Sequence, residues 1–335
     1  MAEIGIAFQT DKAPGRYGQL AAAAEAHGFD VVSVFADLLY QPPQPALLEM
    51  ARATSRVRLG AACLNPYTQH PYEIAGALAT LDVVSGGRAY LGLARGAWLG
   101  TIGIAQARPL AHLRDTAAIV RALLAGDDRG YAGPAYQLAP GIRLRYPAQA
   151  PGRADPLPLL LGSWGPAGAA LAGEIADELK VGGSANPAMV PVIRDWMAAG
   201  ARAAGRDPGQ VRLVFGAVTV VDEDGAAARR LARTEVAKYL AVVAGLDRAG
   251  GLPDGLAEQV RELVAAGRDG DAWALIPDEV LDRFAFSGTP AHVAALAQAV
   301  LDAGAGRIDF GGPHGLDDAR GVGLLGTAVL PKLRR

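Results

Sequence analysis

Polar side chains that could do chemistry lie where short apolar runs of the sequence end. Asp37 follows the run 31–36, His70 lies in the turn after the run 57–64, and His314 follows the run 307–310. In a parallel α/β barrel, the carboxyl ends of the strands form the active face. These spacings indicate Asp37, His70 and His314 as candidate catalytic residues. Each has a structural alternative as a helix cap or loop residue.

Cys63 is the only cysteine, and it lies inside an apolar run. No base is placed beside it by sequence spacing, so a small buried side chain is favoured over a nucleophile. The histidines form no His-x-x-x-His pair, and a metal site built on cysteine pairs is excluded. The sequence also lacks a Gly-x-Gly-x-x-Gly fingerprint and a Walker loop. We expect no metal.

Two glycine-containing turns follow other apolar runs. One holds Gly96 and Ala97, and the other holds Gly162, Ser163, Trp164, Gly165 and Pro166 ahead of an expected helix. Glycine lets backbone N–H groups approach a flat ring or an anion, and a helix N-terminus attracts phosphate. The alternative is that these glycines serve only the turns.

The elements that must position these residues alternate regularly along the chain. Strands are expected at 4–9, 31–36, 57–64, 89–95, 158–162, 178–182, 211–221 and 307–310, and helices at 17–27, 46–54, 72–84, 109–125, 167–177, 187–204 and 289–303. This alternation predicts an α/β fold, a (β/α)8 TIM barrel. We expect a single domain over 1–335 with insertions near 97–155 and 222–286. The alternative is two domains divided near residue 150.

Composition narrows the classes of function. The 335 residues are 51% hydrophobic, which is enough for a large core, and the formal net charge is −2. No basic stripe points to nucleic acid, and no 18-residue apolar segment points to a membrane. The single cysteine is typical of a reducing compartment. We therefore expect a cytoplasmic protein with a small-molecule or peptide substrate and neither a nucleic-acid nor a membrane partner.

Several longer motifs resemble a known family. They are Asn65-Pro66-Tyr67-Thr68-Gln69-His70-Pro71, Ser85-Gly86-Gly87-Arg88-Ala89, Gly162-Ser163-Trp164-Gly165-Pro166 and Phe310-Gly311-Gly312-Pro313. Together they resemble the bacterial luciferase-like superfamily. Within it they are most similar to the methylenetetrahydromethanopterin reductase branch, which uses the deazaflavin coenzyme F420. The resemblance covers nearly the whole chain.

The resemblance implies where the cofactor lies. It implies a homodimeric barrel with the deazaflavin across the strand ends and a non-prolyl cis peptide at Ala62-Cys63 behind the ring. The cofactor-binding residues that it implies are Asp37, Ala62, Cys63, Asn65, Gly96, Ala97, Gly162, Ser163, Trp164, Gly165 and Pro166. Flavin mononucleotide (FMN) is the alternative cofactor, because FMN enzymes of the superfamily share most of these motifs.

The sequence departs from the reductase at two polar positions. The resemblance implies a Glu where this chain has Ala7 and a His where it has Leu38. We therefore predict an F420-dependent reductase that transfers hydride to a C=C, C=N or carbonyl acceptor, for example a dehydroamino acid or an imine in specialised metabolism. The proton donor stays open among Asp37, His70, Tyr67, His314 and water. The alternatives are an FMN-dependent monooxygenase and a non-catalytic ligand-binding barrel.

Overall fold

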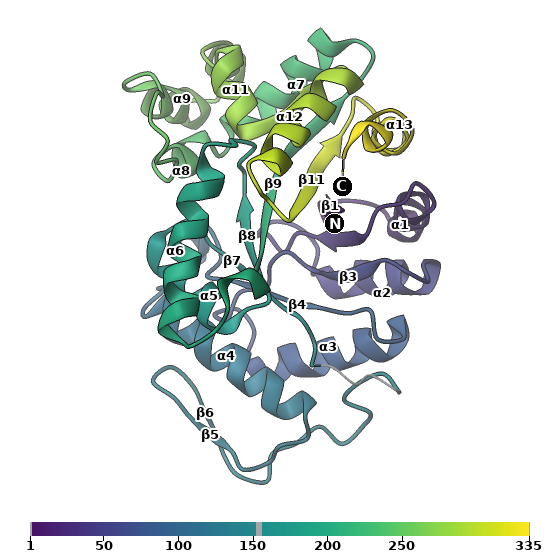
Figure 1. The fold of residues 1–335 in the computed structure, drawn as a ribbon, viewed down its shortest axis with the longest axis vertical. Helices are drawn as coiled ribbons and strands as arrows, with labels where there is room; N and C mark the ends of the chain where they lie inside the picture. The colour runs from purple at the N-terminus through teal and green to yellow at the C-terminus, as the bar shows by residue number, and fades with distance from the viewer. Residues whose placement is uncertain (1, 152–155, 335) are drawn as a thin grey trace.

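Parallel strands form a nearly closed barrel, with helices covering its outside (Figure 1). The computed structural model describes residues 2–151 and 156–334. The strand order is β3-β2-β1-β11-β9-β8-β7-β4, and bridges from Leu59 to Ala89 and from Leu64 to Leu93 join β3 to β4. These eight strands confirm the predicted TIM barrel. They are β1 (Glu3–Phe8), β2 (Val31–Val34), β3 (Arg58–Ala61), β4 (Leu91–Ala94), β7 (Leu159–Gly162), β8 (Glu178–Gly182), β9 (Arg212–Val221) and β11 (Arg307–His314).

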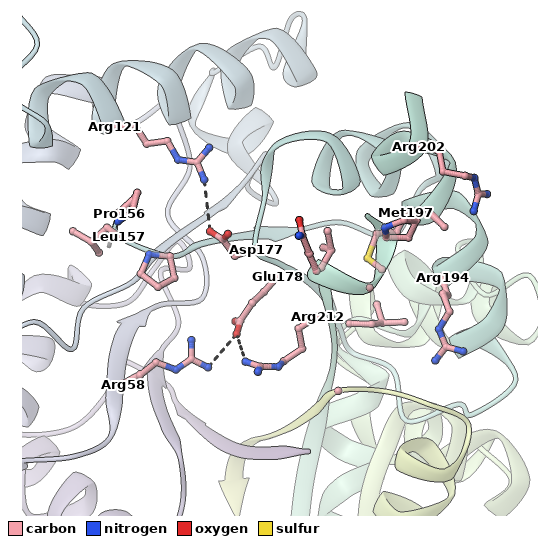
Figure 2. Close-up of a pocket in the computed structure, with 18 of the residues that line it drawn as sticks. Arg58, Arg121, Pro156, Leu157, Asp177, Glu178, Arg194, Met197, Arg202 and Arg212 are labelled. Carbon is pink, nitrogen blue, oxygen red and sulfur yellow. Dashed lines mark hydrogen bonds and ion pairs between the residues drawn. The ribbon is translucent and has the colours of Figure 1, made fainter. Parts of the chain in front are cut away.

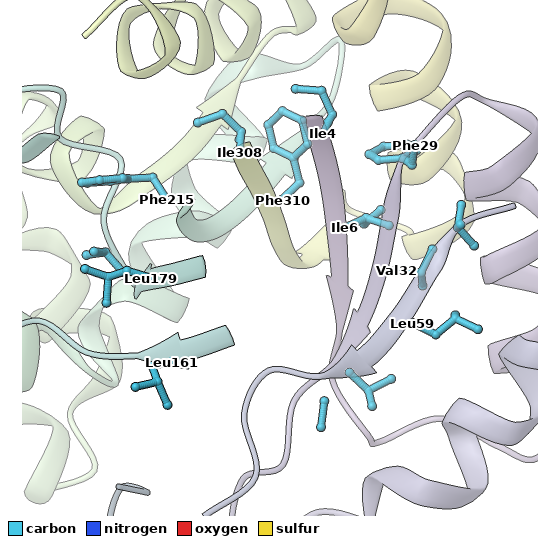
Figure 3. Close-up of a cluster of buried hydrophobic side chains, with 14 of the residues drawn as sticks. Ile4, Ile6, Phe29, Val32, Leu59, Leu161, Leu179, Phe215, Ile308 and Phe310 are labelled. Atoms are coloured by element: carbon cyan, nitrogen blue, oxygen red, sulfur yellow. The ribbon is translucent and has the colours of Figure 1, made fainter. Parts of the chain in front are cut away.

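The main core lies between the barrel and its helices. Alternate strand residues such as Ile4, Ile6 and Phe310 are fully buried and point away from the barrel axis toward the helices (Figure 3). The covering helices are α1 (Arg16–Ala26), α2 (Pro43–Ala53), α3 (Pro71–Ser85), α4 (Pro109–Leu124), α5 (Pro166–Ile175), α6 (Met189–Ala203), α12 (Pro290–Asp302) and α13 (Asp318–Leu324). Short turns η2 (Pro208–Gln210), η3 (Leu325–Val329) and η4 (Leu330–Lys332) complete the outer layer.

Helix α12 begins as the sequence predicts. Thr289 Oγ1 accepts a hydrogen bond from His292 N, and Pro290 takes the first helical position. Helix α2, in contrast, begins at Pro43 and not at Ala46 as expected. Two prolines in its first turn tolerate the missing N–H donors of a helix start, so the proline-rich loop is shorter than predicted.

A strand that the sequence did not predict pairs with the carboxyl half of β9. This strand, β10 (Ala285–Gly288), runs parallel to residues 218–221 of β9. Strand β8 pairs with β9 only as far as Gly216, so the second half of the ten-residue β9 has a free edge that β10 takes. The length of β9 was predicted, and its second half pairs with β10.

The segment between β4 and β7 contains the predicted helix, α4, and two elements that were not predicted. These are η1 (Leu99–Ile102) and a small hairpin, β5 (Tyr131–Ala132) with β6 (Gln137–Leu138). The buried carboxylate of Asp115 on α4 accepts hydrogen bonds from Tyr131 Oη at 2.8 Å, Ala135 N at 2.7 Å and Tyr136 N at 3.0 Å. These bonds fix the hairpin to α4. Residues 152–155 of the segment lie outside the described residues.

The segment between β9 and β10 is helical, as predicted. It contains α7 (Gly225–Ala237), α8 (Leu240–Ala244), α9 (Leu256–Ala265), α10 (Asp269–Ala274) and α11 (Asp278–Phe284). Its apolar residues form a second cluster of their own, which includes Val236, Leu240, Val260 and Phe284. The division into one domain with two insertions stays a prediction.

No helix in the described ranges is both long enough and apolar enough to cross a membrane. The predicted cytoplasmic location and homodimer stay predictions.

Candidate active site

The carboxyl end of the barrel has open space at Gly182, and we call this space the hollow. Lys180 points inward on β8, so Gly182, two residues later, faces the same side. A Cβ at Gly182 would meet no atom within 4 Å, and its register partner on β9 is Gly216. The register continues from Gly216 to Asp309 on β11 and Gly5 on β1, and Gly311 and Ala7 follow two residues later on the same face of these strands. A larger side chain at position 182 would occupy this space.

Ala62 and Cys63 directly follow β3 and lie beside the end of β7, and we call them the floor of the hollow. The peptide bond between Ala62 and Cys63 is cis, as the resemblance implied, and strand pairing resumes at Leu64, whose N–H donates to Gly92 O. Cys63 Sγ lies 3.1 Å from the position that a Cβ of Gly162 would take. The ends of β3 and β7 therefore meet under the hollow.

The thiol of Cys63 is in its protonated form. Burial raises the pKa of this thiol to about 12, and the positive charge of Lys180 only partly opposes that effect. A protonated thiol is a poor nucleophile. The raised pKa agrees with the interpretation of Cys63 as a buried side chain and not a nucleophile, and its role in cofactor binding stays a prediction.

Asp37 lies beyond the end of β2 and accepts a hydrogen bond from Gln9 at the end of β1. Gln9 Nε2 donates to Asp37 Oδ2 over 3.0 Å. Burial raises the pKa of Asp37, and the hydrogen bond from Gln9 partly offsets this rise. The charge of Asp37 also raises the pKa of Cys63, so the carboxyl group lies within electrostatic reach of the floor. Asp37 can hold a proton beside the hollow.

The loop Gly162 to Pro166 joins the hollow to the N-terminus of α5. Ser163 N donates to Lys180 O over 3.0 Å, and Trp164 Nε1 donates to Gly182 O over 2.5 Å. Gly165 is the N-cap of α5, no side chain caps the helix, and a Cβ at Gly165 would meet nothing within 4 Å. Uncapped N–H groups and the helix dipole together suit a phosphate group.

Asn65 and Gly96 lie side by side at the ends of β3 and β4. Asn65 Oδ1 accepts bonds from Tyr67 N and Thr68 N, both at 3.0 Å, so this side chain shapes its own turn. Gly96 has φ +81°, and a Cβ there would lie 3.0 Å from Asn65 Cβ. The next residue, Ala97, is exposed. The close approach requires glycine at position 96.

The two candidate histidines have partners other than Asp37 in the described residues. His70 is exposed and caps α3, because its Nδ1 accepts from Tyr72 N at 3.2 Å. His314 is 1% exposed, and its ring packs 4.9 Å from that of Phe8. Burial lowers the pKa of His314 to about 4, so the ring is neutral at pH 7. Neither histidine contacts Asp37 within the described residues, and their catalytic roles stay predictions.

Sequence reasoning missed Lys180 and Asp309 as members of this region. Lys180 is 6% exposed, and its Nζ lies 2.6 Å from Asp309 Oδ2 inside the barrel. A signal was present, because Glu178 and Lys180 occupy alternate positions of an otherwise apolar strand and so share its inward face. Within residues 2–151 and 156–334, no group of three or more His, Cys, Asp or Glu side chains could hold a metal ion.

A cavity of about 1380 Å³ opens at the opposite end of the barrel. Figure 2 shows Arg58 and Arg212, which lie at the amino ends of β3 and β9, pointing toward Glu178 at the start of β8. Arg121 pairs with Asp177 beside them. The amino-terminal face of a barrel supports stability, whereas chemistry occurs at the carboxyl ends of the strands. The candidate active site is therefore the glycine-lined hollow.

The sequence of this barrel matches a known protein family. The family model described as luciferase-like monooxygenase matches residues 2–307. The chain belongs to the luciferase-like family. This luciferase-like chain is 30% identical over 335 residues to the 5,10-methylenetetrahydromethanopterin reductase of Methanolobus tindarius, covering 98% of this chain and 99% of the relative. It is 28% identical to an F420-dependent glucose-6-phosphate dehydrogenase of Nakamurella multipartita, covering 96% and 93% of the two chains.

Solved structures agree with the family assignment. The coenzyme F420-dependent tetrahydromethanopterin reductase from Methanopyrus kandleri superimposes on the luciferase-like chain with a TM-score of 0.88 and 25% identity, covering 99% of each chain. An F420-dependent secondary alcohol dehydrogenase in complex with an F420-acetone adduct has the same fold, with a TM-score of 0.78 and 19% identity over 100% and 99% of the two chains. The family predicted from the sequence motifs is confirmed.

Proposed function

We propose that this luciferase-like chain is an F420-dependent oxidoreductase that transfers a hydride from the reduced deazaflavin to a C=C, C=N or carbonyl carbon. One observation carries the proposal: the hollow at Gly182 is open space lined by glycine, and the loop Gly162 to Pro166 joins it to the uncapped N-terminus of α5. A flat ring suits the first feature, and a phosphate suits the second. Relatives named as F420-dependent oxidoreductases support the choice of cofactor.

The residues present fit the deazaflavin cofactor. The N–H groups at the start of α5, with Ser163 and Gly165 beside them, would hold the phosphate. Ala62 and Cys63 would support one face of the ring, and the Gly96 turn would border it. When bound, the deazaflavin supplies the two-electron chemistry, and the protein supplies orientation and polarity.

We assign the proton of the reaction to Asp37. When an acceptor carbon gains a hydride, the neighbouring atom gains an electron pair and needs a proton. Asp37 is half-buried with a raised pKa, and Gln9 fixes its orientation. A carboxyl group whose pKa lies closer to neutrality is a better acid for this step. His70 caps a helix and His314 is buried and neutral, so neither is as well suited.

The acceptor that we propose is an uncharged unsaturated group, such as a dehydroamino acid or an imine. Ala7 is fully buried at the end of β1, and Leu38 follows Asp37. Neither side chain is ionisable, so these two positions offer no charge to a polar or ionic substrate group. The altered positions support an acceptor different from methylenetetrahydromethanopterin.

Anaerobic titration with oxidised F420 and, separately, with FMN tests the proposal. We expect a dissociation constant in the micromolar range or below for F420 and much weaker binding of FMN. Tight FMN binding without F420 binding would instead favour a flavin monooxygenase. Binding of F420 without hydride transfer to any unsaturated acceptor would favour a non-catalytic barrel. Return of the oxidised absorbance of F420 on addition of an acceptor reports turnover.

A further inference from the structure

Charged side chains fill the barrel interior beneath the hollow. Arg307 is fully buried, with its Nη1 at 2.5 Å from Glu178 Oε2 and its Nε at 2.8 Å from Asp309 Oδ1. Arg58 and Arg212 each lie 3.0 Å from Glu178 Oε1 (Figure 2). We call this group the ionic column; its members are Glu3, Arg58, Glu178, Lys180, Arg212, Arg307 and Asp309.

The ionic column carries a surplus positive charge. Its four cations, Arg58, Lys180, Arg212 and Arg307, face three carboxylates, so its formal charge is +1. Burial alone would raise the pKa of Asp309, but Arg307 and Lys180 hold it at about 2. The surplus therefore persists at neutral pH. The side chains of Lys180, Arg307, Glu178 and Asp309 are buried, whereas those of Arg58, Arg212 and Glu3 are 25%, 35% and 24% exposed and are therefore more strongly screened.

Lys180 is the cation of the column that reaches the hollow. Its Cε lies 3.4 Å from the position that a Cβ of Gly216 would take, and Gly182 continues the same face above it. Its charge lowers the pKa of Cys63, which lies in the floor, while the charges of Asp309 and Asp37 raise it. An ammonium group has three N–H donors, and Asp309 is the one acceptor of Nζ among the described contacts. Lys180 thus has unused donors beneath the candidate ring site.

We propose that Lys180, through the surplus charge of the ionic column, preferentially stabilises the reduced form of the deazaflavin in the hollow and so sets its reduction potential. This inference rests on the proposed function. Gain of a hydride, one proton with two electrons, and of no second proton would make the ring more negative by one charge. The substrate supplies or receives that hydride. A buried cation under the ring favours the more negative state.

Charge variants of the column provide the test. Lys180→Met removes one cation and brings the column to a formal charge of 0, while Asp309 keeps Arg307 as its partner at 2.8 Å. Lys180→Met combined with Asp309→Asn returns the column to +1. Lys238→Met is the matched control, because Lys238 is exposed directly after α7 and pairs with Glu235. The measurement is the dissociation constant of oxidised and of reduced F420 for each protein.

We expect Lys180→Met to weaken binding of reduced F420 relative to oxidised F420 about tenfold. A tenfold change corresponds to a potential about 30 mV lower for a two-electron couple. The double variant should recover the wild-type ratio, and Lys238→Met should keep it. If Lys180→Met does not fold, Lys180→Gln replaces it, since its amide still donates to Asp309.

The outcomes separate this inference from the proposed function. Failure of the wild-type chain to bind either form of F420 would overturn both. Binding of F420 with equal weakening of the oxidised and reduced forms in Lys180→Met would show a purely structural lysine and overturn the inference alone. A double variant that stays at the ratio of the single variant would overturn it as well, because the net charge would then not be the cause.

Discussion

The Gln9 amide donates to the Asp37 carboxyl over 3.0 Å and joins the ends of β1 and β2, although 28 positions separate the two residues. Burial raises the pKa of Asp37 above the 3.8 of an unperturbed Asp. The folded chain therefore binds this proton more tightly than the unfolded chain. The stabilisation that results is complete below pH 3.8 and is lost as the pH rises through the folded pKa.

Asp37→Asn should consequently raise the free energy of unfolding at pH 7, and the gain should shrink toward pH 4. Urea denaturation at both pH values measures it. The same change should lower F420-dependent turnover about 100-fold, the scale of general acid catalysis. Asp11→Asn, at an exposed position, serves as the control and should change neither quantity. Equal stability gains at pH 7 and pH 4 would contradict the raised pKa.

His314 should make the fold sensitive to mild acid. Burial lowers its pKa from 6.5 to about 4, so the unfolded chain binds more protons between these values and stability falls as the pH falls through them. The loss should reach about 3 kcal/mol near pH 4. His314→Asn removes the titration and suits the residue's φ of 76°. Urea midpoints from pH 8 to pH 4 should fall less for the variant than for wild type; parallel curves would refute this.

Cys63→Ser should leave F420-dependent turnover within about threefold of wild type, because the buried thiol is protonated and its pKa is about 12. Iodoacetamide should accordingly label the native chain slowly at pH 8 and the urea-unfolded chain quickly. Since Cys63 is the only cysteine, the labelled mass reports this site alone. An inactive variant with normal F420 binding would assign a chemical role to the thiol.

Gly182→Val should weaken F420 binding at least tenfold by filling the hollow. A Cβ at this position meets nothing within 4 Å, so the free energy of unfolding should change by only about 1 kcal/mol. Gly270→Val is the matched control, because a Cβ at Gly270 on α10 also meets open space. Fluorescence titration with F420 distinguishes the two variants. Unchanged binding in Gly182→Val would place the cofactor elsewhere.

Glu178→Gln should destabilise the fold by about 3 kcal/mol, because it leaves buried guanidinium groups without their carboxylate. Glu178 is 3% exposed and faces Arg58, Arg212 and Arg307. The comparison is Glu174→Gln, whose pair with Arg114 lies at the surface and should be worth about 1 kcal/mol or less. Urea denaturation of both variants at pH 7 measures the difference. Similar losses would mean that burial does not strengthen the column.

The barrel could be predicted because each strand is a short apolar run that stops at a turn. Strand β10 could not, since Ala285–Gly288 is four residues long and exists as a strand only because the second half of β9 has a free edge. Strand β11 runs to His314, beyond the predicted end at Phe310. This extension buries the His314 ring, which the sequence places in an open turn.

The site could be predicted in part. Strand ends converge in a barrel, which brings Cys63 to Gly162 and Asp37 to Gln9. The cis bond at Cys63 followed from the family resemblance and not from residue spacing. Lys180 was missed because the sequence does not show which residue pairs with it. Its partner across the barrel, Asp309, is 129 positions away.

The pairing of Val221 with Gly288 has a further consequence. These register partners bring the two ends of the helical segment from α7 to α11 onto neighbouring strands, and adjacent strands lie about 4.8 Å apart. The segment also has an apolar cluster of its own. Replacing the whole segment from α7 to α11 with that of a homologue should therefore leave the pairing of β9 with β10 undisturbed. The segment is thus a suitable unit for recombination and for engineering enzymes that accept new substrates while the cofactor site stays the same.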